Sequence, residues 1–294
     1  MPLNYLRACI YEACGNHMCK VSIVIPCYNQ GKFIDDALNS VEKINDKSLY
    51  EVIIVNDGST DTFTNQRLKE LSDTGYQVIF QENKGLAMAR NVAVAASKGQ
   101  YILPLDSDNM IRAEYVYKAI QVLDTDPAIS IVYGDAQQFG DEGGIMLQGP
   151  YNMQRLMISN YIDACAVYRR AVWEANNGYD SKMPYTGIED WDMWLNASFK
   201  GLGFHYIDEV LFDYRVLSTS MIRNLKASKK KGDANLEYLI RKYPQHFGPQ
   251  FITQDIMSKL NESVPGFIGK LIMKKYFPAL FNKKVEDGSL RKYI

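Results

Sequence analysis

The sequence predicts an α/β protein with a mostly parallel central sheet flanked by helices, followed by a helical C-terminal extension. Two observations predict this fold class. Short β-branched runs alternate four times with segments of helical periodicity within residues 21–135. These runs are apolar throughout, as strands are when helices cover both faces of a parallel sheet. With 294 residues, 47% of them hydrophobic, the chain is long enough to bury a sizeable core.

Each element follows from its local pattern. The strands are predicted at residues 21–26, 51–55, 77–80, 101–105 and 129–133. Helices are predicted at residues 33–41, at 86–97 and at 112–123, and a further polar helix is predicted to follow the turn at 56–59 and to end at about Leu71. Asp57-Gly58 is a turn signal, and Ser59 or Thr60 is expected to cap the helix that follows. Glycines mark a long loop after Gly140, and compact patterns return at 162–168 and 186–199.

The chain is expected to divide into three parts. Residues 1–20 form a polar lead-in, and 21–220 form the main domain. Ligands are expected at the carboxyl ends of its parallel strands. Residues 221–294 form a helical, partly basic extension.

Composition excludes several classes of protein. The 33 Lys and Arg residues balance 34 Asp and Glu residues, and the resulting net charge of -1 argues against a surface built for nucleic acid. No apolar run approaches the length of a membrane-spanning helix, and no secretory signal is visible. A cytoplasmic protein is therefore expected.

The five cysteines are an odd number, which is typical of reduced intracellular thiols. Cys9, Cys14 and Cys19 lie near His17 and offer four ligands to a zinc ion. Their spacing is not that of a standard zinc site, so a short segment with free thiols is the favoured interpretation.

Two carboxylates, Asp106 and Asp108, follow the apolar strand 101–105 and are one residue apart. Such a pair can meet a hard divalent cation and the phosphate attached to it. The alternative is a turn in which aspartates bond to the local backbone. The apolar strand favours the site, because a buried strand should not end in uncompensated acids.

The other strand ends carry weaker signals. Asp57 can accept a hydrogen bond from a nucleobase, or can simply belong to a turn. Lys84 can lie near a diphosphate, or can mark the entry to a helix.

A third signal is the segment Glu189-Asp190-Trp191. A carboxylate at a helix N-terminus facing a cleft can act as a general base. Thr186 and Glu189 also have the spacing of a capping box, which explains both without function. Trp194 is expected in the core, whereas the sequence leaves open whether Trp191 belongs to the core or to the site.

Together these segments resemble family 2 glycosyltransferases, in order and spacing, over about residues 21–220. The matching segments are Val21-Ser22-Ile23-Val24-Ile25-Pro26-Cys27-Tyr28-Asn29, Asn56-Asp57-Gly58-Ser59-Thr60-Asp61, Asn83-Lys84-Gly85-Leu86-Ala87-Met88-Ala89-Arg90-Asn91, Asp106-Ser107-Asp108 and Glu189-Asp190-Trp191. The resemblance implies the GT-A (Rossmann-like) fold, a nucleotide-sugar donor, a divalent cation and inversion of the anomeric centre. It also implies UDP as the nucleotide, a saccharide or lipid-linked acceptor, and a role in polysaccharide or glycoconjugate synthesis. By the same resemblance, the main domain would have a nucleotide-binding half at about 21–135 and an acceptor half at about 136–220.

The resemblance also assigns roles. The residues expected to contact the nucleotide sugar are Pro26, Tyr28, Asn29, Asp57, Lys84 and Asp106. Asp108 would hold Mn²⁺ or Mg²⁺ on the diphosphate. Asp190 would be the catalytic base, and Glu189 would orient the acceptor or cap the helix.

One segment departs from the family pattern. Tyr214-Arg215-Val216-Leu217 resembles a Tyr-Arg-x-His segment of many members, but Leu217 replaces the histidine and cannot bind a metal. Arg215 can still reach a phosphate, or can form a surface ion pair.

The tail carries a basic, aromatic stretch at residues 264–284, with five lysines and no acid. It is expected either to lie on an anionic membrane surface, at the inner face of a membrane, or to pack on the protein with its lysines in water. Oligomeric state is left open by the sequence.

Two other functions fit the sequence less well. A nucleotidyltransferase would need a glycine-rich, basic loop after the first strand, which Pro26-Cys27-Tyr28-Asn29 does not provide. A non-catalytic nucleotide-sugar-binding protein would be expected to have lost Asp108 or Asp190, and both are present.

Overall fold

The computed structural model describes residues 19–218, 228–247 and 264–286. Within these ranges it separates into two units. One unit contains the described residues up to Ser181 together with Glu189–Leu217, and the other contains Lys182–Ile188 and the described residues from Ser218 onward. Cys9, Cys14 and His17 lie outside the described residues, and Cys19 is buried.

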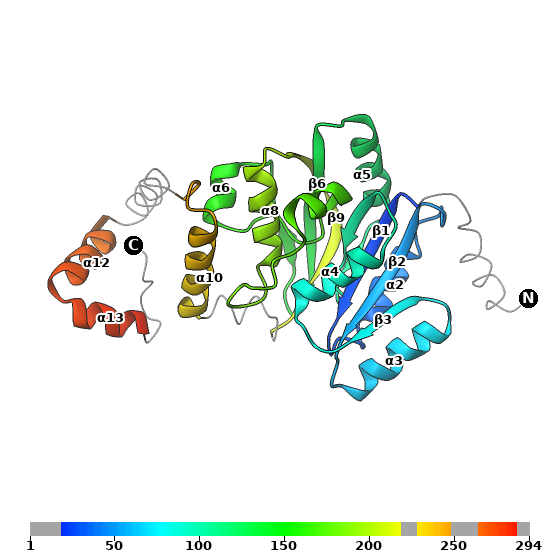
Figure 1. The fold of residues 1–294 in the computed structure, drawn as a ribbon, viewed down its shortest axis with the longest axis horizontal. Coiled ribbons are helices and arrows are strands. Elements are labelled where there is room, and N and C mark those ends of the chain that lie inside the picture. Colours follow the sequence, from blue (N-terminus) through cyan, green and yellow to red (C-terminus); the bar gives the residue numbers. More distant parts are fainter. Residues whose placement is uncertain (1–18, 219–227, 248–263, 287–294) are drawn as a thin grey trace, which may run out of the picture. The chain divides into compact units, whose positions relative to one another are not determined.

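The first unit holds a nine-stranded mixed sheet with the strand order β3-β2-β1-β4-β8-β6-β9-β5, in which β7 pairs with β6 (Figure 1). The strands are β1 (Val21–Cys27), β2 (Tyr50–Asp57), β3 (Gln77–Gln81), β4 (Tyr101–Pro104), β5 (Met110–Ile111), β6 (Ile129–Gly140), β7 (Gly144–Met146), β8 (Val167–Arg169) and β9 (Gly203–Val216). The neighbouring strands β3, β2, β1 and β4 run parallel to one another, whereas β8 runs antiparallel to β4 and β6. The predicted α/β class is confirmed, and the sheet becomes mixed beyond β4.

Helices cover both faces of this sheet. The helices of the first unit are α2 (Ile34–Val41), α3 (Thr62–Asp73), α4 (Leu86–Ala96), α5 (Ala113–Thr125), α6 (Met153–Ile158), α7 (Arg170–Asn176) and α8 (Glu189–Phe199). One continuous core joins alternate residues of β1 and β2 to α2, α3 and α5. Helix α4 packs on the same two strands but contributes nothing to that core, so it covers the opposite face.

Local chemistry explains where α3 begins. Its N-cap is Asp61, whose carboxylate accepts hydrogen bonds from the backbone N–H groups of Phe63 and Thr64. The expected caps, Ser59 and Thr60, instead bond to Asn29: the Ser59 hydroxyl accepts from the Asn29 backbone at 3.0 Å. The prediction was one or two residues early, because three adjacent residues are all good caps.

Two further predictions from the sequence are corrected. Helix α8 begins at Glu189, three residues after Thr186, so Thr186 does not occupy the position directly before the first helical residue. Strand β9, 14 residues long, was not predicted. Its residues are mostly half-buried and mix charged with apolar side chains, so it has no continuous apolar run to signal a strand.

From residue 229 onward the described part of the second unit is mostly helical, in line with the expected helical extension. It contains α10 (Lys229–Lys242), α12 (Val264–Tyr276) and α13 (Pro278–Glu286). Asn235 of α10 is fully buried and exchanges two hydrogen bonds of 3.0 Å with the backbone of Tyr185. No helix in the described part of the chain is both long and apolar enough to cross a bilayer.

Candidate active site

The carboxyl ends of β1 and β2 are joined through Asn29. Its backbone has a φ of 54°, a left-handed conformation that asparagine tolerates. From there its side-chain oxygen accepts hydrogen bonds from the backbone of Thr60 at 2.8 Å and of Asp61 at 3.0 Å. Of the predicted donor-binding residues, Pro26 lies in β1 and Tyr28 directly precedes Asn29, and Tyr28 is 44% exposed at this edge of the sheet.

Asp57, at the end of β2, organises the loop that follows β3. Its buried carboxylate accepts hydrogen bonds from the backbone N–H groups of Lys84 and Gly85, both at 2.9 Å. Gly58 makes this approach possible: its φ is 65°, and a Cβ there would lie 2.5 Å from the Asn83 nitrogen. The Lys84 side chain is left exposed beside this loop.

A buried arginine, which the sequence reasoning did not single out, connects the next two candidates. Arg90 of α4 donates from Nη2 to Asp106 at 2.7 Å and from Nη1 to Glu189 at 2.6 Å. Its side chain is 2% exposed, that of Glu189 is 4% and that of Asp106 is 34%. One signal could have revealed it, since Arg90 is the only charged residue in the alanine-rich helix α4.

Asp190 lies beside this network, and no cationic side chain among the described residues donates a hydrogen bond to it. Its carboxylate accepts from Asn160 Nδ2 and from the Trp191 backbone, each at 2.9 Å. Burial, and then the neighbouring charge of Glu189, raise the pKa of Asp190 to about 7. A carboxylate with a pKa near neutrality is suited to accept a proton.

The two tryptophans of α8 belong to the core. Trp191 is 8% exposed, and its indole N–H donates to the Leu156 carbonyl at 2.6 Å. Trp194 is fully buried and packs edge-on against Tyr168. The core prediction for Trp194 is confirmed, and Trp191 supports the segment that carries Asp190.

Further acids surround Asp106. Burial, then the charge of Asp106, raise the pKa of Asp108 to about 7 and that of Asp163 to about 6. Asp163 is fixed by its backbone N–H, which donates to Gln148, and by its carboxylate, which accepts from the Cys165 backbone at 2.9 Å. The sequence reasoning missed Asp163 because, although it lies within the compact pattern of residues 162–168, it belongs to none of the recognised motifs.

Arg215 is engaged within the protein. Its Nη2 donates to Asp36 at 2.6 Å, its Nε donates to the Asp108 carbonyl at 2.9 Å, and its guanidinium lies between the rings of Phe33 and Phe139. Its backbone N–H also donates to Asn109 Oδ1. The end of β9 is therefore attached to the loop that carries Asp108, which places Leu217 two residues beyond this attachment.

The oxygen donors fit a hard divalent cation. The charge of Asp106 disfavours ionisation of Asp108 and Asp163, and the charge of Asp163 disfavours ionisation of Asp108, so an added cation would relieve this repulsion. Among the described residues, however, no three His, Cys, Asp or Glu side chains are arranged to hold an ion by themselves. A metal here would therefore need oxygens from a ligand as well.

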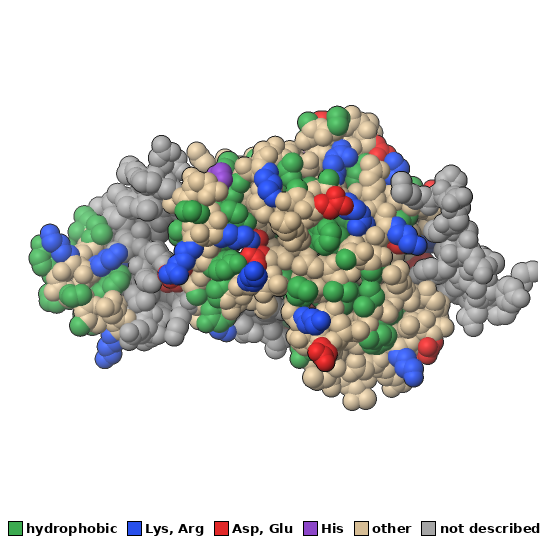
Figure 2. All heavy atoms as spheres, in the orientation of Figure 1, with side chains coloured by type: hydrophobic (Ala, Val, Ile, Leu, Met, Phe, Trp, Pro, Cys, Tyr) green, Lys and Arg blue, Asp and Glu red, His purple; other side chains and the backbone are tan. Residues whose placement is uncertain are grey.

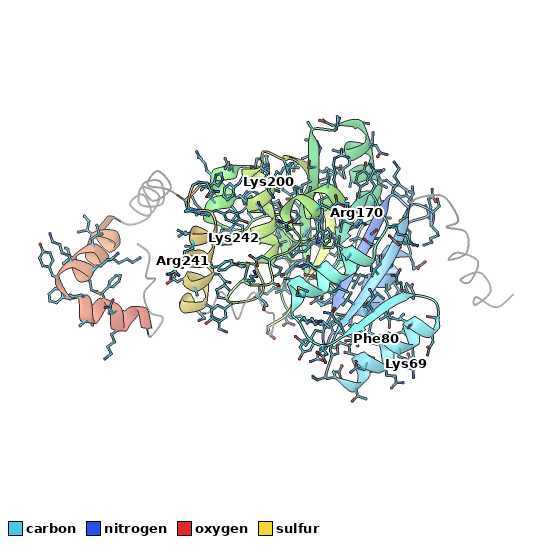
Figure 3. All side chains as sticks on the ribbon, viewed as in Figure 1. Lys69, Phe80, Arg170, Lys200, Arg241 and Lys242 are labelled. Carbon is cyan, nitrogen blue, oxygen red and sulfur yellow. The ribbon has the colours of Figure 1, made fainter. Side chains whose placement is uncertain are left out.

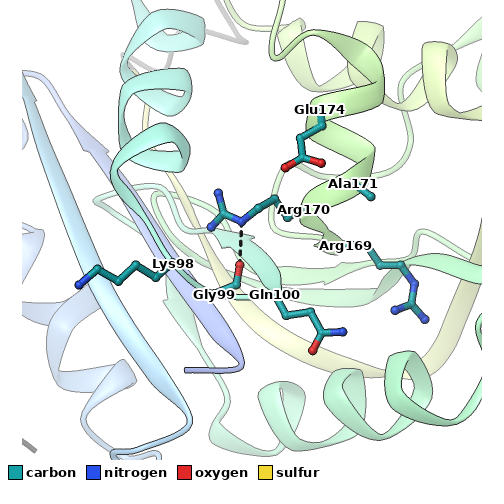
Figure 4. A pocket seen from close by; sticks show the side chains of 7 residues that line it. All are labelled: Lys98, Gly99, Gln100, Arg169, Arg170, Ala171 and Glu174. Carbon is teal, nitrogen blue, oxygen red and sulfur yellow. Dashed lines mark hydrogen bonds between the residues drawn. The ribbon is translucent and has the colours of Figure 1, made fainter. Parts of the chain in front are cut away.

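A separate hollow of about 410 Å³ lies at the opposite, amino edge of β4 (Figure 4). It is lined in part by Lys98, Arg169 and Arg170. Arg170 donates to the carbonyls of Gly99 and Val94, both at 2.9 Å, and Arg169 likewise donates to backbone carbonyls. Through these bonds Arg169 and Arg170 connect β8 and the start of α7 to neighbouring backbone segments. The hollow lies at the other end of β4 from Asp106 and Asp108.

Comparison with known proteins gives a consistent result. The family described as Glycosyl transferase family 2 matches residues 22–175. A chondroitin synthase of Pasteurella multocida is 28% identical over 218 residues, which are 71% of this chain but only 22% of that protein. The chain therefore spans about a fifth of the length of this relative.

Two solved structures share the fold. The first is S. aureus TarS in complex with UDP-GlcNAc, with a TM-score of 0.61 and 21% identity over 75% of this chain and 65% of that one. The second is a mannosyltransferase from Pyrobaculum calidifontis in complex with GDP-Man and Mn²⁺, with a TM-score of 0.59 and 15% identity over 95% and 83% of the two chains.

Proposed function

The chain belongs to glycosyl transferase family 2 and has the GT-A fold, and we propose that it moves a sugar from a nucleotide-sugar donor to an acceptor hydroxyl. One observation carries this proposal. Arg90 binds Asp106 and Glu189 at once, which links the carboxylate proposed to contact the donor to the segment that carries Asp190, the proposed base.

The donor would bind at the carboxyl ends of β1, β2 and β4. Pro26, Tyr28, Asn29 and Asp57 would surround the base and ribose, with Lys84 near the nucleotide and Asp106 near the sugar. The two similar structures are complexes with UDP-GlcNAc and with GDP-Man, which supports a nucleotide sugar as the donor here. We favour UDP by family resemblance.

Asp108 would hold a divalent cation, Mn²⁺ or Mg²⁺, together with the donor diphosphate. When bound, such a cation neutralises charge on the leaving diphosphate. The repulsion among the surrounding carboxylates supports this assignment, as does the Mn²⁺ in the mannosyltransferase complex. Arg215 donates to the backbone carbonyl of Asp108 and so supports this loop, and its contact with a donor phosphate stays a prediction.

We infer a single displacement with inversion at the anomeric carbon. The acceptor oxygen forms the new bond to that carbon while the bond to the diphosphate oxygen breaks and its electron pair leaves with the nucleoside diphosphate. Asp190 takes the proton of the acceptor hydroxyl. Glu189, paired with Arg90, positions Asp190 rather than taking the proton itself.

The acceptor would be a saccharide or a lipid-linked saccharide, and the pathway the synthesis of a polysaccharide or glycoconjugate. The relative named chondroitin synthase supports this class of acceptor. A cytoplasmic location stays a prediction of the sequence.

The decisive test is calorimetric titration with UDP, GDP and dTDP, each with Mn²⁺ and with chelator. We expect one nucleotide to bind preferentially, and only with the metal. The sugar conjugates of that nucleotide are then tested for transfer to saccharide acceptors, and the anomeric configuration of the product is read by NMR. The absence of binding to all three nucleotides would contradict the proposal.

A further inference from the structure

Helices α12 and α13 leave most of their apolar side chains uncovered. The exposed residues are Ile268, Leu271, Ile272, Tyr276, Phe277 and Leu280, which are 44–63% exposed. In contrast, Phe281 is 4% exposed, and Lys274 lies over its ring. Two helices of 13 and 9 residues make too small a core to bury their own apolar surface.

The exposed residues of α12 share one face. Ile268, Leu271, Ile272 and Tyr276 follow the spacing i, i+3, i+4 and i+8, which forms a stripe along an α-helix. The ammonium of Lys275 lies within this stripe, 5.2 Å from the centre of the Tyr276 ring. An apolar stripe of this kind normally packs against another surface.

The charges around the stripe have one sign. Lysines 270, 274, 275, 283 and 284 lie in residues 264–284, and this range has no Asp or Glu. On the face of these helices shown in Figure 2, hydrophobic and basic side chains lie side by side with no acidic ones. The chain as a whole is nearly neutral, so this concentration of positive charge is local.

We propose that α12 and α13 form a docking surface for an anionic lipid bilayer. The apolar stripe would enter the boundary between headgroups and acyl chains, with the helices parallel to the membrane plane. Lysine stems can follow the apolar surface while their ammonium groups reach lipid phosphates. A second copy of the same surface would place lysines opposite lysines, so charge complementarity favours the bilayer.

Vesicle co-sedimentation of the full chain tests this proposal. We expect binding to vesicles that contain phosphatidylglycerol, weaker binding at high salt, and little binding to pure phosphatidylcholine. The double substitution Lys274→Glu/Lys275→Glu should weaken binding by about tenfold or more, because each basic residue near an anionic surface contributes to the attraction. Leu271→Ser/Ile272→Ser should also weaken it, at any salt concentration.

The matched control is Lys43→Glu/Lys69→Glu, which changes the net charge equally on exposed lysines of the first unit; Lys69 of α3 is labelled in Figure 3. This control should bind vesicles like the parent. The proposal would be overturned if the control variant lost as much vesicle binding as Lys274→Glu/Lys275→Glu, or if the parent protein did not bind vesicles. So would a concentration-dependent dimer that Leu271→Ser/Ile272→Ser dissolves without any vesicle binding. Vesicle binding needs no transfer activity, so its result is independent of the proposed chemistry.

Discussion

Arg90 and Glu189 form an ion pair with an Nη1–Oε1 distance of 2.6 Å, and side-chain exposures of 2% and 4% bury it almost completely. The pair joins α4 to the first residue of α8, 99 positions later in the chain. Since Asp190 follows Glu189 directly, the same contact fixes the residue proposed as the base.

The substitution Arg90→Ala should strongly destabilise the protein. It would remove the guanidinium that contacts both Asp106 and Glu189, and breaking a buried pair in this way costs about 3–5 kcal/mol. Urea denaturation measures the loss. The control is Arg67→Ala, which removes a more exposed pair with Asp35 and should cost about 0–1 kcal/mol. Equal effects of the two substitutions would contradict a buried, structural role for Arg90.

Asp190→Asn should abolish most transfer and leave donor binding nearly intact. An amide of the same shape keeps the contact with Asn160 but cannot accept the proton, and a general base typically contributes about 10²–10⁴-fold. Single-turnover transfer and calorimetric affinity for the donor nucleotide separate the two effects. Near-parental turnover in this variant would rule out the base assignment.

Transfer should depend on pH through Asp190. The base acts when ionised, and its raised pKa of about 7 means that the ionised fraction falls below neutral pH. We therefore expect kcat/KM to fall about tenfold per pH unit below about pH 7 and to level off above it. The profile is measured at saturating metal, so that protonation of Asp108 does not contribute. A flat profile down to about pH 5 would be incompatible with this base.

Asp108→Asn should make the metal-free protein more stable and remove metal-dependent nucleotide binding. The folded-state pKa of Asp108, about 7, lies above its unfolded value. Its contribution to stability is therefore greatest at low pH and is lost as pH rises through 7. A neutral amide avoids this loss, so we expect the free energy of unfolding to rise by about 1–2 kcal/mol at pH 8 and by less at pH 5. Each kcal/mol corresponds to a rise of about 2–4 °C in Tm. Scanning calorimetry with chelator measures both, and a lower Tm at pH 8 would refute the assignment.

Leu217→His should strengthen metal-dependent nucleotide binding. Arg215 attaches the end of β9 to the Asp108 loop, so an imidazole two residues later can reach a cation held there. We expect about tenfold tighter UDP binding with Mn²⁺, or ~1.4 kcal/mol, and no change with chelator. Leu217→Asn serves as a polar control without imidazole. An unchanged affinity for Leu217→His would show that this segment lies away from the metal.

Apart from the two-residue strand β5, the sequence by itself determined the strand and helix order up to β6, because apolar runs, helical periodicity and turn residues act over a few positions. It also indicated which strand ends carry acids and amides, and so the edge of the sheet at which chemistry belongs. The sequence did not predict strand β9, whose residues mix charged and apolar side chains, or the start of α8 at Glu189, because local pattern alone sets neither.

Only the tertiary structure decided how the acids are partnered. Glu189 is paired with Arg90 and Asp190 is not, although the two are adjacent in sequence. Asp163, from an irregular segment, joins Asp106 and Asp108 only through folding. Burial and long-range charge set the pKa of each carboxyl group, and both depend on residues far apart in the chain, so no local pattern could have assigned them.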